Sequence, residues 1–495
     1  MTADDVTVQV DPALAAASER AMAYLAGVRD RPVAAAATVD DLRAALDLPL
    51  PDEGVDGAEV VQALADAAEP GLVATGSPRY FGFVIGGALP AALGADWLAS
   101  AWDQNAGLYV GGPSAAVAEE VAGRWVLDLL GLPATASFGF VTGCQMAHVT
   151  ALAAARNDVL ARVGWDVERR GLIGAPRVRV LASDVRHATV DRALRLLGLG
   201  TDAVEPVASG PDARLRVDAL ADALRASSDP TIVCAQVGEV NTGAIDPVAE
   251  ISDLAHAAGA WVHVDGAFGL WAGASTRLRT LVAGVERADS WATDFHKWLN
   301  VPYDSGFAAC AHPDRHRAAM GTYASYLEHA APDGPRDQMD WNPEFSRRAR
   351  GFAVYAALRS LGRQGVADLV DRCCAHARRF ADQLQAIDGV EVLNDVVLDQ
   401  VLVGFPPPGG GARRAMALHH GAGAGHEDEA AVAQRVVEAV QGSGECWMSG
   451  TTWRGRPAMR ISVVNWQTSA ADVDRSVRAI DAAVRAARPV TAKGR

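Results

Sequence analysis

The sequence predicts an α/β protein whose mainly parallel sheet is covered by helices on both faces, followed by a smaller α+β domain. Two observations support this prediction. Short apolar segments alternate with helical patterns between about residues 138 and 311, as expected for strand–helix–strand units whose strands are buried on both faces. From about residue 345 the alternation stops, and helices and strands are mixed, which is typical of an α+β domain.

Length and composition restrict the class of protein. The chain has 495 residues, of which 50% are hydrophobic and 21% are charged, so it can bury a large core and is not mainly disordered. At about 150 residues per domain it has room for about three structural units. Its formal net charge of −15 disfavours a nucleic-acid-binding protein, which usually presents a basic surface.

Other features predict a cytoplasmic protein. No strongly apolar segment of about 18 residues is free of charges, so no membrane span is expected. The first residues are acidic where a secretory signal needs basic ones. The six cysteines are scattered and form no C-x-x-C pair, so we expect buried, reduced thiols rather than a disulfide framework or a metal site.

The N-terminal elements are predicted from composition and spacing. An Ala-rich, acidic N-terminal segment, residues 1–75, has the apolar spacing of short amphipathic helices. Glycine, proline and aromatic residues are dense between 71 and 113, which predicts loops and short elements rather than one long helix. A helix is expected over 115–130, closed by Gly131 and Pro133.

The large domain is expected to span residues 76–340 and the C-terminal domain residues 341–495. In the large domain, strands are expected near 138–141, 177–182, 231–237, 260–264, 290–293 and 306–311, with helices near 145–162, 187–197 and 246–258. In the C-terminal domain, helices are expected over 345–361 and 367–387, and strands over 390–397, 400–405 and 459–464.

Lys297 is the strongest candidate for a catalytic residue. It follows an expected strand, in the segment Thr293-Asp294-Phe295-His296-Lys297-Trp298, and ligand sites of α/β sheets form at such strand ends. Most lysines are solvated surface groups, but the apolar neighbours of this one indicate a pocket. A lysine in an apolar pocket can have a lowered pKa and form a Schiff base with a carbonyl group.

Chemistry with pyridoxal 5′-phosphate (PLP) needs three further groups, and the sequence offers a candidate for each. A carboxylate must keep the pyridine nitrogen protonated, and Asp265 ends the preceding strand. The turn Gly143-Cys144-Gln145 could hold the phosphate at a helix N-terminus. His187, at another strand–helix junction, could stack on the ring. Each alone has an ordinary explanation, such as a turn aspartate or a capping histidine, but together they predict a PLP site.

These residues lie within a longer segment of the sequence that resembles a known family. Between about Pro78 and Arg460 the sequence resembles the PLP-dependent group II decarboxylases, which include aromatic amino-acid and glutamate decarboxylases. The strongest match is Asp294-Phe295-His296-Lys297-Trp298-Leu299, followed by Pro302-Tyr303-Asp304-Ser305-Gly306. The resemblance implies PLP fold-type I, like that of aspartate aminotransferase, with a mainly parallel seven-stranded sheet. It also implies a homodimer with its sites at the interface.

The resemblance implies roles for individual residues. Lys297 corresponds to the lysine that forms the Schiff base with PLP, and Asp265 to the partner of the pyridine nitrogen. Ala267 is expected to pack on the ring, His187 to stack over it, and His296 to lie beside the phosphate or the substrate.

Five further positions match the family's cofactor site but depart from its usual residues. Gly143, Cys144 and Gln145 match the phosphate-binding turn, which usually has small and hydroxyl residues. Asp294 stands where the family often has a phosphate contact; an acid there is unfavourable, so we expect it to turn away. Glu239 stands near the cofactor, either tuning the ring or selecting a cationic substrate, or else as a salt-bridged or solvated glutamate.

Candidate substrate contacts come from two regions. Tyr80, Phe83 and Trp102, among the aromatic residues of 71–113, could form the apolar walls of a pocket, or pack in the core or in a dimer. Arg460 matches an arginine in the family's C-terminal domain, and fold-type I enzymes commonly pair such an arginine with the substrate carboxylate. A structural ion pair is the alternative.

Sequence and resemblance together predict decarboxylation of an L-amino acid, and the aromatic walls favour an aromatic one. In aromatic decarboxylases a tyrosine on a mobile loop donates the last proton, but Gln338 or Met339 stands in its place, and neither is an acid at neutral pH. Tyr323 and Tyr326 lie upstream. Because related aldehyde synthases lack this tyrosine, oxidative deamination to an aldehyde stays an alternative, as do transamination and retro-aldol cleavage.

Two other classes of protein are disfavoured. A nucleotide-dependent dehydrogenase would need a G-x-G-x-x-G segment opening a strand–helix unit near the N-terminus, and there is none. A PLP-fold protein that only binds ligands would have no need of Lys297.

Overall fold

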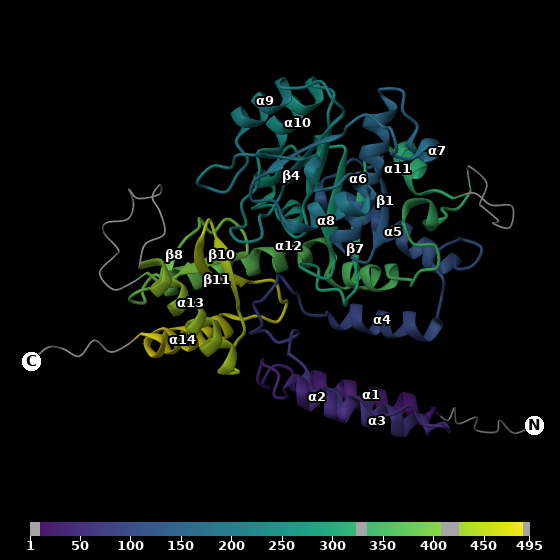
Figure 1. Ribbon diagram of the computed structural model, residues 1–495. Helices are drawn as coiled ribbons and strands as arrows, with labels where there is room; N and C mark the ends of the chain where they lie inside the picture. Colours follow the sequence, from purple (N-terminus) through teal and green to yellow (C-terminus); the bar gives the residue numbers. More distant parts are fainter. Residues whose placement is uncertain (1–9, 323–333, 407–424, 489–495) are drawn as a thin grey trace, which may run out of the picture.

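The computed structural model describes residues 10–322, 334–406 and 425–488 (Figure 1). Its centre is a seven-stranded sheet with the strand order β1-β7-β6-β5-β4-β2-β3. Strands β2 to β6 pair in parallel, whereas β7 runs antiparallel to both β1 and β6. The predicted mainly parallel sheet is therefore confirmed. The strands are β1 (Ser137–Val141), β2 (Arg179–Ser183), β3 (Val204–Val207), β4 (Thr231–Gln236), β5 (Trp261–Asp265), β6 (Ser290–Asp294) and β7 (Gly306–Cys310).

Alternate residues of the central strands face opposite layers of helices, because side chains of a strand alternate with a period of two. In β5, Trp261 joins the buried cluster that contains residues of α6 and α8, while Val262 and Val264 join the larger cluster that contains residues of α5 and α10. Burial on both faces explains why these strands are mostly apolar. The helices of this part are α5 (Pro113–Leu130), α6 (Cys144–Ala161), α7 (Val167–Arg170), α8 (Ala188–Leu196), α9 (Val217–Arg225), α10 (Val248–Ala257) and α11 (Pro313–Met320).

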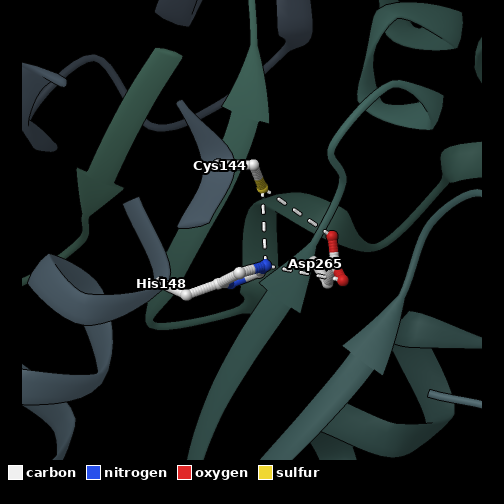
Figure 2. Close-up of side chains that lie close together, drawn as sticks. All are labelled: Cys144, His148 and Asp265. Atoms are coloured by element: carbon white, nitrogen blue, oxygen red, sulfur yellow. Dashed lines mark hydrogen bonds and ion pairs between the residues drawn. The ribbon is translucent and has the colours of Figure 1, made fainter. Parts of the chain in front are cut away.

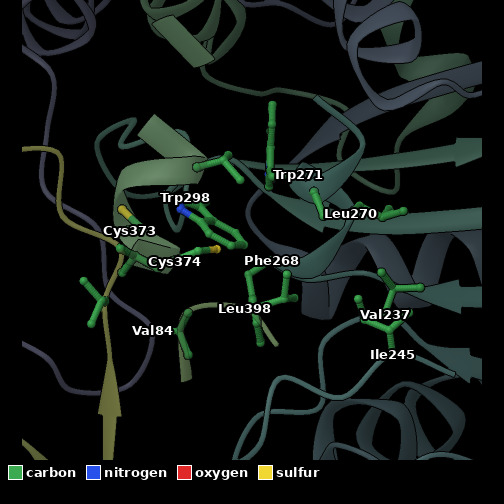
Figure 3. Close-up of a cluster of buried hydrophobic side chains, with 14 of the residues drawn as sticks. Val84, Val237, Ile245, Phe268, Leu270, Trp271, Trp298, Cys373, Cys374 and Leu398 are labelled. Carbon is green, nitrogen blue, oxygen red and sulfur yellow. The ribbon is translucent and has the colours of Figure 1, made fainter. Parts of the chain in front are cut away.

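The C-terminal part is built on an antiparallel four-stranded sheet with the order β10-β11-β9-β8. The long helix α12 packs against α4 and α5 as well as against α14 and β9, so it connects the two parts. Buried side chains of both parts belong to one cluster, of which Figure 3 shows a portion; the predicted boundary at residue 340 stays a prediction. The elements are α12 (Gly351–Leu384), β8 (Glu391–Val392), β9 (Gln400–Gly404), α13 (Gly425–Gly442), β10 (Ser449–Trp453), β11 (Arg456–Ser462) and α14 (Ala470–Ala487).

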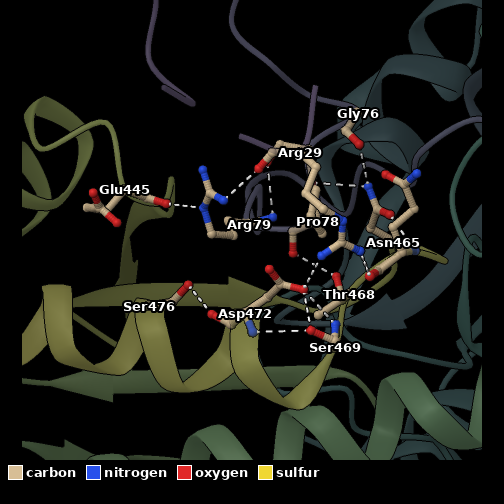
Figure 4. Close-up of polar contacts among 12 residues, drawn as sticks. Arg29, Gly76, Pro78, Arg79, Glu445, Asn465, Thr468, Ser469, Asp472 and Ser476 are labelled. Atoms are coloured by element: carbon tan, nitrogen blue, oxygen red, sulfur yellow. Dashed lines mark hydrogen bonds and ion pairs between the residues drawn. The ribbon is translucent and has the colours of Figure 1, made fainter. Parts of the chain in front are cut away.

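The N-terminal segment forms the predicted short helices, α1 (Pro12–Gly27), α2 (Val39–Leu46) and α3 (Gly57–Ala68). Polar contacts tie the chain around them to the C-terminal part (Figure 4). The buried side chain of Arg79 donates to the backbone carbonyls of Glu445 at 2.6 Å and Arg29 at 2.7 Å. The Arg29 guanidinium lies 3.3 Å from Asp472 of α14.

Two predictions about elements are wrong, and a third is confirmed. Residues 90–102, expected to be loops and short elements, form the thirteen-residue helix α4 (Pro90–Trp102). Pro90 stands at its start, where proline is tolerated because the first N–H groups of a helix have no partner within it. The two helices predicted over 345–361 and 367–387 are confirmed, since α12 consists of two helices that meet at a non-helical Gly362. The strand predicted over 390–397 is only the two residues of β8.

Several helices and strands were not predicted, namely α7, α9, α11, α13, α14, β3 and β10. Within the part of the chain that the structure describes, no helix has both the length and the apolarity needed to cross a membrane.

Candidate active site

Lys297 and Asp294 form the centre of the site, where strand β6 ends. Asp294 is the last residue of β6, and its Oδ2 lies 3.0 Å from Lys297 Nζ. Burial alone would lower the pKa of Lys297, but the charge of Asp294, together with that of Asp265, raises it above its ordinary value. The lowered pKa that an apolar pocket can produce is therefore absent, because the amine has a carboxylate partner.

The turn before α6 leaves little room for side chains. A Cβ atom on Gly143 would lie 3.1 Å from Cε1 of His296, and one on Gly306 would lie 2.5 Å from Cα of Gly143. The backbone N–H of Cys144, the first residue of α6, donates to Asp294 Oδ1 at 2.5 Å. Asp294 therefore does not turn away as expected: it faces the helix N-terminus, whose partial positive charge favours an anion.

Asp265, the last residue of β5, is buried beside α6 (Figure 2). Its Oδ2 lies 3.5 Å from Nε2 of His148, and its Oδ1 accepts a hydrogen bond from the backbone N–H of Ala267 at 3.2 Å. The Cys144 sulfur lies 3.9 Å from the same Oδ1. Burial alone would raise the pKa of Asp265, but the interaction with the N–H of His148 and the charge of Lys297 outweigh burial and hold it well below its usual range. The carboxylate is thus ionised, as the partner of a protonated pyridine nitrogen must be.

His187 is both a helix cap and a member of the site. As the N-cap residue of α8, its Nδ1 accepts from the backbone N–H of Thr189 at 3.3 Å. Burial lowers its pKa, and the charges of Asp265 and Lys297 both act on it, so it lies near them as a neutral imidazole. The amide of Gln145, expected at the phosphate, instead donates to the backbone carbonyl of Thr189 at 3.3 Å.

Glu239 stabilises its own turn. The buried carboxylate accepts from the backbone N–H groups of Asn241 at 3.0 Å and Thr242 at 2.8 Å, and from the Thr242 hydroxyl at 2.9 Å. Because these hydrogen bonds occupy the carboxylate oxygens within the turn, they do not support a role for Glu239 in selecting a cationic substrate.

Arg460, on β11, carries a buried Nε that has no hydrogen-bond partner among the described residues. Burial lowers the pKa of its guanidinium, and the charges of Glu239 and Asp399 oppose this. Buried donors are normally paired, so this guanidinium is suited to an anionic ligand.

Aromatic rings gather around the loop that covers Lys297. A Cβ atom on Gly86 would lie only 2.1 Å from the carbonyl oxygen of Lys297, so this loop packs directly on the lysine's backbone. Within it, Tyr80 stacks on Trp447 with ring centres 5.0 Å apart, and Phe83 tilts against the same indole at 5.3 Å.

Two further rings change the predicted picture of the pocket. Tyr303 stacks on His296 with ring centres 4.3 Å apart. Roles for Tyr303 and Trp447 were not predicted from the sequence. Trp102 packs edge-on against Phe352 of α12 at 5.2 Å and is half exposed. Among the described residues, the ring of Trp102 therefore contacts a ring of α12 and none of the other rings named above.

The segment that matches the family's mobile loop is packed in the interior. Gln338 and Met339 lie in the short 3₁₀-helix η6 (Gln338–Trp341), and both are buried. The Gln338 amide donates to the carbonyl of Ala116 at 3.1 Å, and the backbone N–H of Met339 donates to that of Gly107 at 2.9 Å. Tyr323 and Tyr326 lie outside the described residues.

These residues fit PLP. The amine of Lys297, the ionised Asp265 and the N-terminus of α6 gather around the same sheet edge, and they match the aldehyde, the pyridine nitrogen and the phosphate of the cofactor. The phosphate would have to share this helix N-terminus with Asp294, which accepts from the N–H of Cys144. When bound, PLP supplies a sink for the electrons released as carbon dioxide leaves. Asp265 would hold the proton on the ring nitrogen, Gly143 and Cys144 would border the phosphate, and His187 would flank the ring.

A family model supports the same conclusion. The model described as the pyridoxal-dependent decarboxylase conserved domain matches residues 40–405. The chain therefore belongs to the pyridoxal-dependent decarboxylase family, and it is a PLP-dependent amino-acid decarboxylase with the α/β fold-type I architecture.

Individual relatives agree with this assignment. The chain is 29% identical over 420 residues to tryptophan decarboxylase 1 of Oryza sativa subsp. japonica, covering 81% of this chain and 79% of that one. It is 28% identical over 308 residues to a phenylacetaldehyde synthase of a Rosa hybrid cultivar, 59% of either chain. The crystal structure of Oryza sativa TDC with PLP and tryptamine superposes with a TM-score of 0.87 at 25% identity, over 98% of this chain and 99% of that one.

Proposed function

We propose that the protein converts an aromatic L-amino acid into the corresponding amine and carbon dioxide. The observation that carries this proposal is a set of ring contacts around the site: Tyr303 stacks on His296, which precedes Lys297, and Tyr80 and Phe83, in the loop whose Gly86 contacts the backbone of the lysine, pack on Trp447. Aromatic side chains bind another ring through offset or edge contacts over a large apolar area. The similarity to a tryptophan decarboxylase supports the same class of substrate.

In this proposal Arg460 attracts the substrate carboxylate. Its buried Nε lacks a partner among the described residues, and a guanidinium can bind a carboxylate with two parallel hydrogen bonds. Lys297 and Asp265 lie at the same end of the sheet, so with the cofactor bound there an amino acid would bring its amine toward the cofactor and its carboxylate toward Arg460.

A second candidate is oxidative conversion to an aldehyde. In this reaction the amino acid, oxygen and water give an aldehyde, carbon dioxide, ammonia and hydrogen peroxide. Two observations favour it: Gln338 and Met339, at the matched tyrosine position, supply no acid, and the phenylacetaldehyde synthase is among the relatives.

Product analysis distinguishes the two reactions. The PLP-loaded protein is incubated in air with each proteinogenic amino acid, and the products are measured by mass spectrometry, with peroxide assayed in parallel. A product lighter than an aromatic substrate by carbon dioxide, without peroxide, supports the first proposal. An aldehyde with ammonia and peroxide supports the second, and turnover confined to non-aromatic amino acids contradicts the aromatic assignment.

We also propose a homodimer in the cytoplasm. Helices α1 and α3 leave Leu14, Met22, Val60 and Leu64 between 49% and 67% exposed, and Figure 1 shows these helices as a layer beside α4. Contiguous apolar surface of this kind is typical of an interface. All six cysteines are unpaired and buried, which is consistent with a reducing compartment; fractionation of cells that express the protein tests the location.

A further inference from the structure

Behind Asp265, four side chains form a continuous series of polar contacts along β5. The two-residue period of the strand puts Trp261, His263 and Asp265 on one face, and Ser290 of β6 lies opposite His263 in the sheet register. Trp261 Nε1 donates to Ser290 Oγ at 2.9 Å, and Ser290 Oγ lies 2.9 Å from His263 Nδ1. His263 Nε2 lies 2.9 Å from Nδ1 of His148, whose Nε2 lies 3.5 Å from Asp265 Oδ2 and 3.4 Å from the Cys144 sulfur.

The groups at the two ends of this series determine which atom donates and which accepts in each hydrogen bond. An indole N–H only donates and an ionised carboxylate only accepts. Nε2 of His148 must therefore carry a proton toward Asp265, and Nδ1 of a neutral His148 accepts from Nε2–H of His263. By the same logic Nδ1 of His263 accepts from the hydroxyl of Ser290, whose oxygen accepts from Trp261.

This arrangement satisfies every polar atom in the series. If His148 were instead doubly protonated, His263 would have to donate to Ser290, and the hydroxyl proton of Ser290 would have no acceptor among the described residues. Trp261, His148, His263 and Ser290 are all fully buried, so an unpaired donor there is costly. Burial also lowers the pKa of His263 to about 3, which keeps it neutral.

A metal ion is the competing explanation for part of this cluster. Ligand atoms of Cys144, His148 and Asp265 lie within 4.8 Å of one another (Figure 2). However, the nitrogen of His148 that faces the other two is the one that carries the proton when His263 donates to its opposite nitrogen, and a protonated nitrogen cannot bind a metal.

We propose that Trp261, Ser290, His263 and His148 form a one-way hydrogen-bond relay that holds Asp265 as an oriented, ionised acceptor for the pyridine nitrogen of PLP. His263 and Ser290 act through other residues and are positioning residues. The inference rests on the cofactor alone and not on which amino acid is the substrate. Lys297, His187 and Cys144 are the other titratable groups that act on Asp265 or contact it.

The first test replaces His263 and measures cofactor binding rather than turnover. His263→Leu removes the donor to His148, and we expect the Kd for PLP to rise about tenfold, as for the loss of one hydrogen bond in a charged network. If Asp265 is held less firmly, the pyridine nitrogen is protonated less often and the ring carries less positive charge. The nitrogen that joins Lys297 to the cofactor is then easier to protonate. The pH midpoint of the bound cofactor's visible absorbance should therefore rise by about one unit.

Two further variants separate the relay from simple packing. His263→Gln keeps a donor toward His148 and should restore the Kd to within about threefold of the wild type. Ser290→Ala removes only the hydroxyl and should shift both readouts in the same direction by a smaller amount; it also serves if His263→Leu fails to fold. In a ¹⁵N-histidine NMR spectrum of the apoenzyme, both relay histidines should be neutral with the proton on Nε2.

His316 provides a matched control. It is also buried, contacts the hydroxyl of Ser137 at 2.9 Å and the carbonyl of Trp341 at 3.1 Å, and has a pKa that burial lowers to about 3. His316→Leu should destabilise the protein but leave the PLP affinity and the absorbance midpoint unchanged.

Several results would overturn the relay. The first is that His263→Leu and Ser290→Ala both keep the wild-type absorbance midpoint and the wild-type Kd for PLP, while they lose as much stability as His316→Leu. The second is a doubly protonated His148 in the apoenzyme spectrum. The third is one equivalent of bound metal that Cys144→Ala removes. A wild-type protein that binds PLP but makes no product from aromatic amino acids would contradict the proposed substrate and leave the relay measurable.

Discussion

Asp294 controls the protonation of the lysine that must capture the cofactor. Burial would lower the pKa of Lys297, but Asp294 and the other nearby charges raise it, so the amine of the apoenzyme is protonated at neutral pH and must lose a proton before it attacks an aldehyde. The rate of PLP uptake should therefore increase with pH. Asp294→Asn removes the largest contribution that raises the pKa, so the increase should begin at lower pH.

This prediction is measured by mixing apoenzyme with PLP across a pH series and following the visible absorbance. Asp304→Asn serves as the control, because Asp304 pairs with Arg350 at 2.6 Å instead of with the lysine. An uptake profile of Asp294→Asn that coincides with that of the wild type would show that Asp294 does not set the pKa of Lys297.

Glu119 and Arg347 form a fully buried ion pair 2.7 Å apart, and Arg347 also donates to the carbonyls of Ala106 and Phe140. Glu119→Gln leaves the guanidinium charge buried without its counter-ion. We expect a loss of about 3–5 kcal/mol in the free energy of unfolding, measured by urea denaturation. Asp128→Asn, which breaks the exposed pair with Arg363, should cost less than about 1 kcal/mol. Equal losses in the two variants would contradict this account.

At the scale of residues, the groups that face the cofactor could be predicted from the sequence, but the residues that position those groups could not. Lys297, Asp265 and His187 stand at strand ends in a recognisable order, and the structure brings them within electrostatic reach of one another. His148 and His263 were missed. Their spacing held a signal, since His148 is four residues after Cys144 on one helix face and His263 is two before Asp265 on one strand face. Their contact depends on how α6 packs on β5, which spacing does not specify.

At the scale of elements, glycines with equal space but different backbone angles should respond differently to substitution. Gly362 interrupts α12 with φ 61° and ψ 178°, whereas Gly94 lies within α4, and a Cβ atom at either would meet nothing within 4 Å. Gly362→Ala should lower the free energy of unfolding by about 1–3 kcal/mol through backbone strain. Gly94→Ala should raise it by about 1 kcal/mol, because alanine favours a helix. Urea denaturation checks both, and a stabilised Gly362→Ala variant would contradict the strain.

The same two helices show why element boundaries were hard to predict. Pro90 and Gly94 have the composition of a loop, yet proline is compatible with the first helical turn and one glycine costs little. In α12 the break at Gly362 was expected near the right place, between the predicted helices 345–361 and 367–387. The structure has two helices on either side of this break, and both bury apolar faces against the same core.

At the scale of the whole molecule, the strand order needed information that single segments do not contain. Strand β7 was predicted, but not its antiparallel direction. The segment 295–305 between β6 and β7 is short, and a parallel crossover needs about a dozen residues or more, so the direction could have been inferred. Its place between β6 and β1 depends on the close approach of Gly306 to Gly143, a contact between distant parts of the sequence.

The exposed apolar residues of α1 and α3 predict the assembly. If these helices form a dimer interface, Leu64→Asp, introduced with Met22→Asp, places charges in a buried apolar contact and should convert the dimer to a monomer. Light scattering coupled to size-exclusion chromatography measures the mass. Ile173→Asp is the matched control, since Ile173 is also apolar and 96% exposed but lies between α7 and β2. It should leave the dimer intact, whereas a wild-type protein that elutes as a monomer at micromolar concentration would contradict the interface.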